Sequence, residues 1–181
     1  MINSLTVSHS IVLYRISYSD AEPLFLLIDQ NRERLRNWLP FVDMTTNASQ
    51  TEAFIGSLFT PHCREMVFTI RYHNETAGLI GFKDIDRINK KLEIGYWIAP
   101  QFEGKGIITK SVAAMIDAAF EKMEMNRVQI CCGVGNIKSS NVPKRLNFRF
   151  EGIQRNGEWL NGQFIDLEVY SMLKNEWKKV V

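Results

Sequence analysis

The chain has 181 residues, of which 45% are apolar and 23% are charged, and its net charge at pH 7 is +2. This composition is typical of one globular domain and excludes global disorder. The small net charge gives no support for direct nucleic-acid binding, and no run of about 18 apolar residues exists that would span a membrane.

The N-terminus lacks the basic patch and apolar run of a signal peptide, and the cysteines are Cys63, Cys131 and Cys132. Cys131 and Cys132 are adjacent in a strand-like run, so their side chains point to opposite faces and cannot easily pair. We therefore expect reduced thiols in a cytoplasmic protein. None of the histidines stands at a metal-binding spacing from a cysteine, so no metal site is predicted.

The N-terminal third is predicted to contain one strand followed by helices. The expected elements are a strand over Ile11–Arg15, a helix over Ala21–Gln30 with Asp20 as N-cap, a helical continuation over 31–39 that ends at Pro40, and a helix over 48–59 capped by Thr46 or Asn47.

The apolar period then changes to two, which predicts a meander of strands. The expected strands are 66–72, 77–85 and 92–98, with turns at 73–75 and at Asn89-Lys90. A helix over 107–122 follows, and its apolar face carries Ile108, Val112, Met115, Ile116, Ala119 and Phe120.

The last third is predicted to contain a strand over 128–134, a loop with a short helix over 136–146, and two closing strands. Pro143 is expected near the first turn of the short helix, because a deeper proline costs about 3 kcal/mol. Asn161-Gly162 between the two closing strands is a strong hairpin signal.

This order predicts a mixed α+β fold. The strand–helix–strand crossover over 92–98, 107–122 and 128–134 requires one parallel strand pair inside an otherwise antiparallel sheet. Parallel neighbours can separate at their carboxyl ends, and a cleft then opens beside the segment 101–106.

The segment 101–106, Gln-Phe-Glu-Gly-Lys-Gly, is the most informative stretch of the chain. Gly104 and Gly106 let the backbone approach a ligand closely, and the helix that follows offers unpaired N–H groups at the positive end of its dipole. These properties predict a phosphate cradle built from main chain. The alternative is a plain tight connection. A P-loop would need Gly-Lys-Ser/Thr, and a Rossmann motif would need an acidic residue about 20 residues further on; neither is present.

Over residues 8–177 the chain resembles the GNAT acyltransferases, and within them the ribosomal-protein N-terminal (RimJ/RimL-like) branch. The stretches that carry the resemblance are RLRNWLP at 34–40, EIGYWI at 93–98, the loop 101–106, Asn126-Arg127, NIKSS at 136–140, and Asn147-Phe148 before Glu151-Gly152. The resemblance implies a single N-acetyltransferase domain over 1–181, with a mostly antiparallel central sheet, one splayed parallel pair and flanking helices.

The resemblance also implies an activity. Acetyl-CoA is expected in the cleft, and a primary amine is expected to attack the thioester directly, without an acyl-enzyme. The acceptor implied is the N-terminal α-amine of a ribosomal or other protein. A small-molecule amine such as a polyamine or an antibiotic is one alternative, and a non-catalytic acyl-CoA-binding module is another. A homodimer is also possible for such a protein.

The implied site residues form three groups. Those expected to bind the cofactor are Trp97, Ile98, Gln101, Phe102, Glu103, Gly104, Lys105, Gly106, Ile107, Thr109, Asn136 and Ser139. Backbone N–H groups near Trp97 or Ile98 would stabilise the oxyanion. Trp38 and Leu39 are expected in the wall of the acceptor pocket, although Trp38 fits a core position equally well.

The third group is catalytic. Many members of the superfamily place a tyrosine as proton donor seven residues after the asparagine, but that position is Pro143. The ribosomal branch uses a serine three residues after the asparagine, and Ser139 stands there. Glu158 matches the branch's proposed base, and Glu93 is its rival. An α-amine has a pKa near 7.8, so a weak base suffices for it, whereas a lysine needs a well-placed one.

Two basic clusters have open interpretations. Arg32, Arg34 and Arg36 do not share one helical face, which favours a solvated surface over an RNA-binding patch. Three other cations, Lys138, Lys144 and Arg145, are either surface residues or contacts for the 3′-phosphate of coenzyme A.

Overall fold

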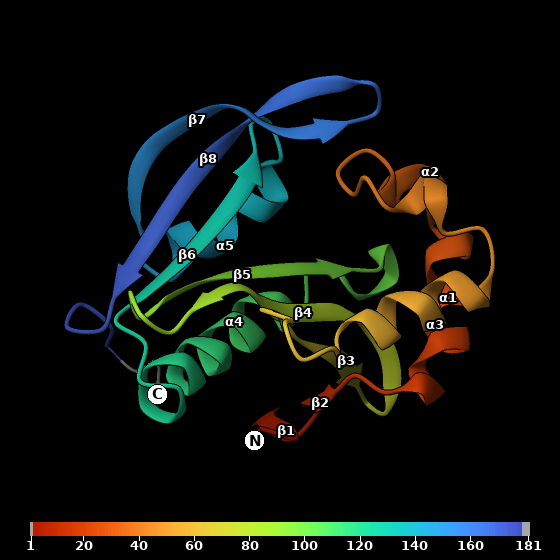
Figure 1. Cartoon of the computed structure of the whole chain (residues 1–181), viewed down its shortest axis with the longest axis horizontal. Coiled ribbons are helices and arrows are strands. Elements are labelled where there is room, and N and C mark those ends of the chain that lie inside the picture. Colours follow the sequence, from red (N-terminus) through yellow and green to blue (C-terminus); the bar gives the residue numbers. More distant parts are fainter. Residues whose placement is uncertain (1, 179–181) are drawn as a thin grey trace.

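The computed structural model describes residues 2–178, while Met1 and residues 179–181, which complete the predicted domain, lie outside the described residues. An eight-stranded sheet runs through the molecule in the order β1-β2-β3-β4-β5-β6-β8-β7 (Figure 1). All neighbouring strands are antiparallel except β5 and β6, which are parallel. The predicted mixed fold with one parallel pair is therefore confirmed.

The bounds of the elements follow chain order. The strands are β1 (Ser4–Ser8), β2 (Ile11–Arg15), β3 (Met66–Tyr72), β4 (Glu75–Asp86), β5 (Lys91–Ile98), β6 (Arg127–Gly133), β7 (Arg149–Leu160) and β8 (Gln163–Leu173). The helices are α1 (Ala21–Gln30), α2 (Arg32–Leu35), α3 (Ala48–Ser57), α4 (Ile107–Asp117) and α5 (Ile137–Arg145), and α4 continues as one wide π-type turn over Ala118–Lys122.

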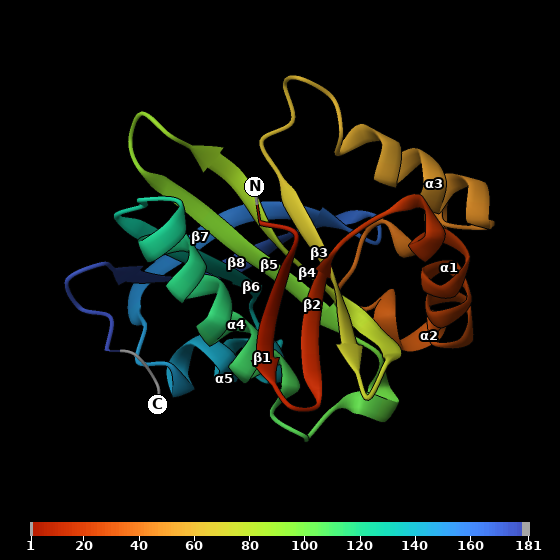
Figure 2. The same cartoon turned by 90° about the horizontal axis from the view of Figure 1, so that it is seen from below.

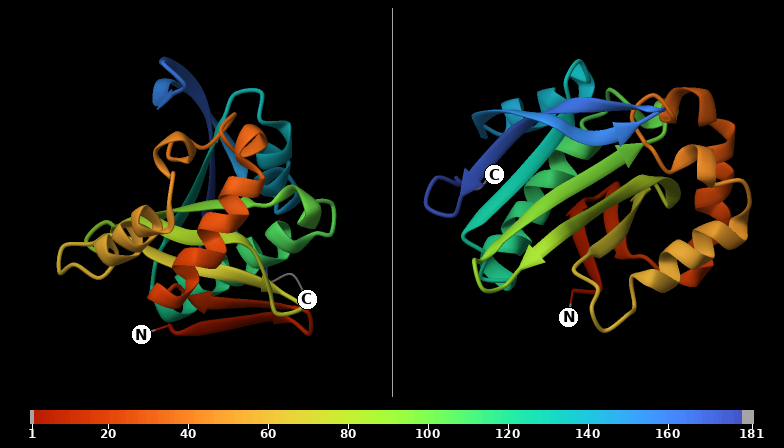
Figure 3. Two further views of the ribbon diagram at one scale, coloured as in Figure 1. Left: turned by 90° about the vertical axis from the view of Figure 1, so that its right-hand side faces the viewer. Right: turned by 45° about the horizontal axis from the view of Figure 1, so that its top comes forward.

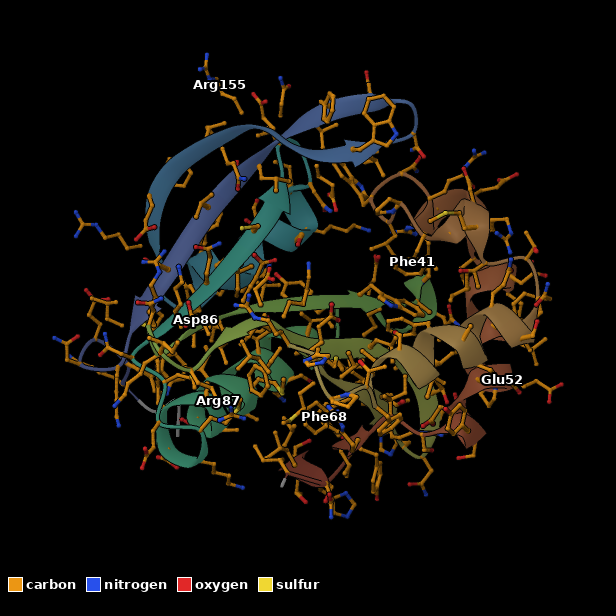
Figure 4. All side chains as sticks on the ribbon, viewed as in Figure 1. Phe41, Glu52, Phe68, Asp86, Arg87 and Arg155 are labelled. Carbon is orange, nitrogen blue, oxygen red and sulfur yellow. The ribbon has the colours of Figure 1, made fainter. Side chains whose placement is uncertain are left out.

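Helices cover the two sides of the sheet separately. Figure 2 shows α4 and α5 on one side of the molecule and α1, α2 and α3 on the other. The predicted apolar face of α4 packs against β1, β2 and β5, and Val112, Met115 and Ile116 are fully buried there. Phe68 stands edge-on to Phe82 in the core, with ring centroids 6.5 Å apart (Figure 4). No helix among residues 2–178 is long and apolar enough to cross a membrane.

Local signals placed several elements correctly. Asn47 caps α3 by accepting from the Gln50 amide, with Gln50 returning the bond as a capping box. Asn161 and Gly162 both have positive φ values, 49° and 83°, which is the backbone of the predicted two-residue hairpin between β7 and β8.

Three expectations are wrong and a fourth holds in part. Strand β1 was not predicted, although its Ser-Leu-Thr-Val-Ser sequence alternates, and it pairs with β2. Asp20 is the N-cap residue of α1, as predicted, but its side chain makes no capping hydrogen bond, because its carboxylate accepts from the Ser17 amide and pairs with Arg71 at 2.8 Å. The helical continuation ends at Leu35 rather than at residue 39. Pro143 is the seventh of the nine residues of α5 rather than a first-turn residue.

Candidate functional site

A cleft begins where β5 and β6 separate. In the part of the chain that the structure describes, these strands pair from Lys91 and Arg127 to Glu93 and Gln129. Beyond this point β6 continues along β8 while β5 continues along β4, so their carboxyl-terminal halves diverge (Figure 3). The predicted separation of the parallel pair is present.

The main chain of β5 presents alternate residues to this opening. The Ala99 amide donates to the Ala77 carbonyl across the β4 ladder. Because hydrogen-bonding groups alternate along a strand, the N–H of Trp97 also faces β4, whereas the N–H of Ile98 faces the side from which β6 has departed. Of the two expected oxyanion donors, Ile98 is therefore the one directed toward the cleft.

The glycine loop has the backbone of an anion cradle. Gly104 and Gly106 have φ values of 74° and 71°, and an added Cβ at Gly104 would meet no atom within 4 Å. Gly106 is the N-cap of α4, and the first hydrogen bond of the helix runs from the Lys110 amide to the Gly106 carbonyl at 3.0 Å. The N–H groups that precede Lys110, including those of Ile107 and Thr109, have no intrahelical acceptor and point out of the helix end.

Two cations compensate the acidic side chain of this loop. The Glu103 carboxylate pairs with Arg34 of α2 at 2.7 Å and with Lys138 of α5 at 2.5 Å. All three side chains are partly exposed, so each pair contributes little to stability. Their consequence is electrostatic: Glu103 adds little net negative charge beside the N–H groups of the loop.

The other side chains of the loop, those of Gln101, Phe102 and Lys105, point away from its main chain. Phe102 is buried against Tyr72, with ring centroids 6.2 Å apart, and Lys105 Nζ lies 5.3 Å from the Tyr72 ring centroid. Gln101 is exposed at the entrance to the loop. Phe102 thus anchors the loop to β3, while the loop main chain stays accessible.

Helix α5 brings Asn136 and Ser139 to the cleft from the α4 side. Asn136 is the N-cap of the helix, and its Oδ1 accepts from the Ser139 amide at 3.2 Å. The Ser139 hydroxyl does not take part in this cap. It lies 3.3 Å from Cys132 Sγ of β6 and 3.4 Å from Tyr96 Oη of β5. Ser139 therefore sits between the two diverging strands.

The groups around Ser139 are neutral. Burial raises the pKa of the Cys132 thiol to about 11, and burial also raises the pKa of Tyr96 well above its usual range. Both groups stay protonated near pH 7, so neither of these two neighbours of Ser139 carries a negative charge.

Carboxylates gather on the other face of the same strands. Glu93, at the last paired position, contacts Lys83 Nζ of β4 at 3.3 Å and Gln129 Nε2 of β6 at 3.4 Å. Although burial opposes the change, Glu93 raises the pKa of Lys83 above its usual value. Cys131 lies on this face too, and burial raises the pKa of its thiol to about 12. Cys131 and Cys132 thus point to opposite faces, as predicted.

The second candidate base reaches this face from β7. The bulged register between Gln154 and Glu158 bends the outer part of the β7–β8 hairpin over the cleft (Figure 3). Burial raises the pKa of the half-buried Glu158 carboxyl, Lys83 opposes that rise, and Glu93 adds to it. The two alternative bases predicted from the sequence, Glu93 and Glu158, therefore interact electrostatically with each other and with the same lysine, Lys83.

The turn after α2 contacts the tip of the β7–β8 hairpin and the end of β6. The Trp38 ring and the Ile165 side chain both lie over Gly133, where an added Cβ would approach them to 3.0 and 3.1 Å. Asn161 Nδ2, at the hairpin tip, donates to the Arg36 carbonyl at 2.8 Å. Trp38 thus faces the end of β6. Leu39 instead packs against the hydrophobic core, and Phe41 lies in the same turn (Figure 4).

The arginines of the turn region are paired with carboxylates. Arg32 contacts Asp29, Arg34 contacts Glu103, and Arg36 contacts Asp43. Arg32 also donates to the carbonyls of Val42 and Thr45, which holds the turn in place. This pairing supports the interpretation as ordinary surface charge.

The three basic residues of α5 have different surroundings. Lys138 lies at the glycine loop through Glu103, whereas Lys144 lies over the Tyr170 ring and near Glu168. Arg145 is exposed. Lys138 is therefore the cation of this group that stands beside the predicted phosphate cradle.

Sequence reasoning missed Tyr96, Cys132, Lys83 and Gln129 as neighbours of the predicted site residues. These residues lie on strands β4, β5 and β6, and only the tertiary fold brings them into contact with the predicted site residues. One signal was available: Pro143 stands four residues after Ser139 and removes the amide that would bond its carbonyl. The donor that replaces this amide was not readable from local sequence.

The arrangement has the parts of a group-transfer site. An anion cradle lies at one end of the opening, a neutral hydroxyl lies at its middle, and a pair of carboxylates with one lysine lies on the opposite face. A ligand with phosphates and a reactive tail would fit the first two, and a nucleophile activated by a base would fit the third.

Comparisons with known proteins agree with this chemistry. Residues 10–149 match the family model described as the acetyltransferase (GNAT) domain. The putative ribosomal N-acetyltransferase YdaF of Bacillus subtilis (strain 168) is 40% identical over 178 residues, covering 95% of this chain and 96% of that protein.

Two solved structures are similar over their whole length. The microcin C7 self-immunity acetyltransferase MccE, in complex with acetyl-CoA and AMP, has a TM-score of 0.90 and 30% identity, covering 96% of this chain and 97% of that chain. RimL, the ribosomal L7/L12 α-N-protein acetyltransferase, has a TM-score of 0.89 and 28% identity, covering 94% and 97%, and contains coenzyme A in a disulfide with a cysteine of that protein.

Proposed function

Because the chain belongs to the GNAT acetyltransferase family and uses acetyl-CoA as cosubstrate, we propose that it acetylates the N-terminal α-amine of a protein, with a ribosomal protein as the first candidate. The observation that carries the proposal is the two-sided cleft. The glycine loop and Ser139 lie on its α4–α5 face, and Glu93 and Glu158 lie on the other.

Different residues of the cleft are assigned to different parts of acetyl-CoA. We assign the diphosphate to the main-chain N–H groups of the segment 104–109, with Lys138 beside them. The Ile98 amide is assigned to the carbonyl oxygen on which negative charge develops. Asn136 holds the first turn of α5, so that Ser139 faces the sulfur.

The reaction needs one proton removed and one negative charge stabilised. The neutral amine forms a bond to the thioester carbonyl carbon, and a carboxylate, Glu158 or Glu93, accepts the proton that the nitrogen loses. The carbon–sulfur bond then breaks, and the Ser139 hydroxyl donates a hydrogen bond to the departing thiolate. The Cys132 thiol already lies 3.3 Å from the Ser139 hydroxyl, so this hydroxyl can contact a sulfur atom in the cleft.

The charges on the acceptor face favour an α-amine over a polyamine. Lys83 pairs with Glu93 and also lowers the pKa of Glu158, so it neutralises part of the charge of the two carboxylates. A polycation would meet this lysine, whereas a chain end brings a single amine that is already partly neutral at pH 7. A small-molecule amine is the second candidate, because the spermidine N(1)-acetyltransferase of Escherichia coli (strain K12) is 24% identical over 162 residues.

The deciding experiment offers the protein acetyl-CoA and a panel of acceptors, with coenzyme A release and mass spectrometry as readouts. The panel contains ribosomal-protein N-terminal peptides without lysine, the same peptides with a blocked α-amine and one added lysine, and spermidine. We expect acetylation of the free α-amine peptides. Turnover of spermidine alone, or of the lysine peptides alone, would overturn the assignment of the acceptor.

The pH dependence of Lys83→Met tests whether the carboxylates beside Lys83, Glu158 and Glu93, supply the base. Lys83 lowers the pKa of Glu158, so its removal raises that pKa further and leaves less carboxylate at a given acidic pH. The ratio of variant to wild-type kcat/KM cancels the protonation of the amine itself. We expect this ratio to fall as the pH falls through the raised pKa. The matched control Lys91→Met, an exposed residue at the start of β5, should give a flat ratio.

A further inference from the structure

Pro143 deprives one carbonyl of α5 of its helical partner. In a regular α-helix the amide of residue 143 would donate to the carbonyl oxygen of Ser139, four residues earlier, but proline has no N–H. A buried carbonyl without a donor costs about 1–3 kcal/mol. The carbonyl affected belongs to the residue whose hydroxyl lies between the diverging strands.

A side chain from another element supplies the missing donor. Tyr96 Oη donates to the Ser139 carbonyl oxygen at 3.0 Å. Tyr96 is on β5 and α5 follows β6, so this hydrogen bond spans the opening between the two strands. The Ser139 hydroxyl lies 3.4 Å from the same tyrosine oxygen. Tyr96 therefore touches both polar groups of Ser139 that face the cleft.

We infer that Tyr96 is a positioning residue: its hydroxyl replaces the amide that Pro143 lacks, fixes the Ser139 carbonyl, and so aims the Ser139 hydroxyl at the thioester sulfur. This inference rests on the proposed function, because it explains how Ser139 is held in the donor role assigned to it there.

The contacts distinguish this role from that of a proton donor. The Tyr96 proton is used in the bond to the carbonyl, so it is not available to a thiolate. Burial keeps the pKa of Tyr96 well above its usual range, so the hydroxyl remains a donor throughout the neutral range. Pro143 and Tyr96 thus act together as one positioning device: the proline leaves the Ser139 carbonyl without its helical donor, and the Tyr96 hydroxyl donates to it instead.

A double-mutant cycle tests the device. Tyr96→Phe should lower kcat by about tenfold and leave the KM for acetyl-CoA within about twofold, because the hydroxyl positions Ser139 without contributing to cofactor affinity. Pro143→Ala restores an N–H to the Ser139 carbonyl. In that background the same Tyr96→Phe change should cost less than about threefold in kcat. Tyr14→Phe, a half-exposed tyrosine on β2, is the matched control and should retain wild-type kcat.

The carbonyl 13C resonance of Ser139 provides a readout that does not depend on activity. It should move in Tyr96→Phe and return toward its wild-type position in Tyr96→Phe/Pro143→Ala. An unmoved resonance, or equal kinetic losses in both backgrounds, would overturn the inference while leaving the proposed function intact. A wild-type protein that acetylates no peptide would instead overturn the proposed function, and the resonance would still decide whether Tyr96 and residue 143 share this carbonyl.

Discussion

Gly104→Asp is expected to abolish acetyl-CoA binding. The substitution places a carboxylate in the loop assigned to the diphosphate, and repulsion of about 3 kcal/mol corresponds to at least about a 100-fold rise in Kd. A Cβ at this position meets no atom of the protein, so the effect is not one of internal packing. Isothermal titration calorimetry with acetyl-CoA measures it directly.

Gly104→Asn separates charge from backbone strain. Asparagine has nearly the shape of aspartate and tolerates the left-handed backbone that φ = 74° requires. We expect this variant to bind acetyl-CoA only about tenfold more weakly than wild type and to unfold at about the same temperature as Gly104→Asp. Equal affinities for both variants would show that charge at the loop is unimportant, and unchanged affinity for Gly104→Asp would refute the cradle.

Ser139→Ala is expected to lower kcat by about 100-fold with the KM for acetyl-CoA within about threefold. The reason is that the hydroxyl acts on charge that appears only as the carbon–sulfur bond breaks, so the ground state loses little. Steady-state kinetics with a peptide that the wild type acetylates would measure both parameters.

Ser140→Ala is the matched control for Ser139→Ala. Ser140 is the next residue of α5 and is almost fully buried, but its hydroxyl bonds the Ile137 carbonyl and Lys144. Its loss should leave kcat near the wild-type value. Full activity in Ser139→Ala would move the donor role to another group, and equal losses in both variants would indicate a general disturbance of α5.

Much of the fold could be predicted from the sequence because its signals are local. Period-two alternation located β3 and β4, Asn47, one of the two predicted caps, marked the start of α3, and Asn161-Gly162 marked the final hairpin. The glycine loop was recognisable because strand, loop and helix are contiguous. The fold and the loop therefore followed from residues that are neighbours in the chain.

The corrections have tertiary causes. Asp20 stands at the N-cap of α1, but its carboxylate pairs with Arg71 of β3 instead of capping the helix. Pro143 was expected in the first turn of α5, because proline deeper in a helix leaves a carbonyl unbonded, and here Tyr96 satisfies that carbonyl from outside the helix. No local pattern reports a hydrogen bond made by a residue 43 positions away.

The same limit applied to the acceptor face. Glu93 and Glu158 appeared as competing candidates because the resemblance implied each of them as the base, and their separation in the chain gave no sign that they are neighbours. The bend of the β7–β8 hairpin brings them together with Lys83. The two carboxylates therefore belong to one coupled group of charges, and Lys83→Met tests whether that group supplies the base.

Three contacts surround the cleft: Asn161 joins the hairpin to the Arg36 carbonyl, Trp38 lies over Gly133 at the end of β6, and Arg34 of α2 pairs with Glu103 in the loop after β5. An opening enclosed in this way would select ligands by their width. A lysine side chain on the surface of a folded protein could enter only if the surrounding surface also fitted into the opening. An extended chain terminus is narrow enough to enter alone. Selection of this kind would operate before any chemical recognition of the amine.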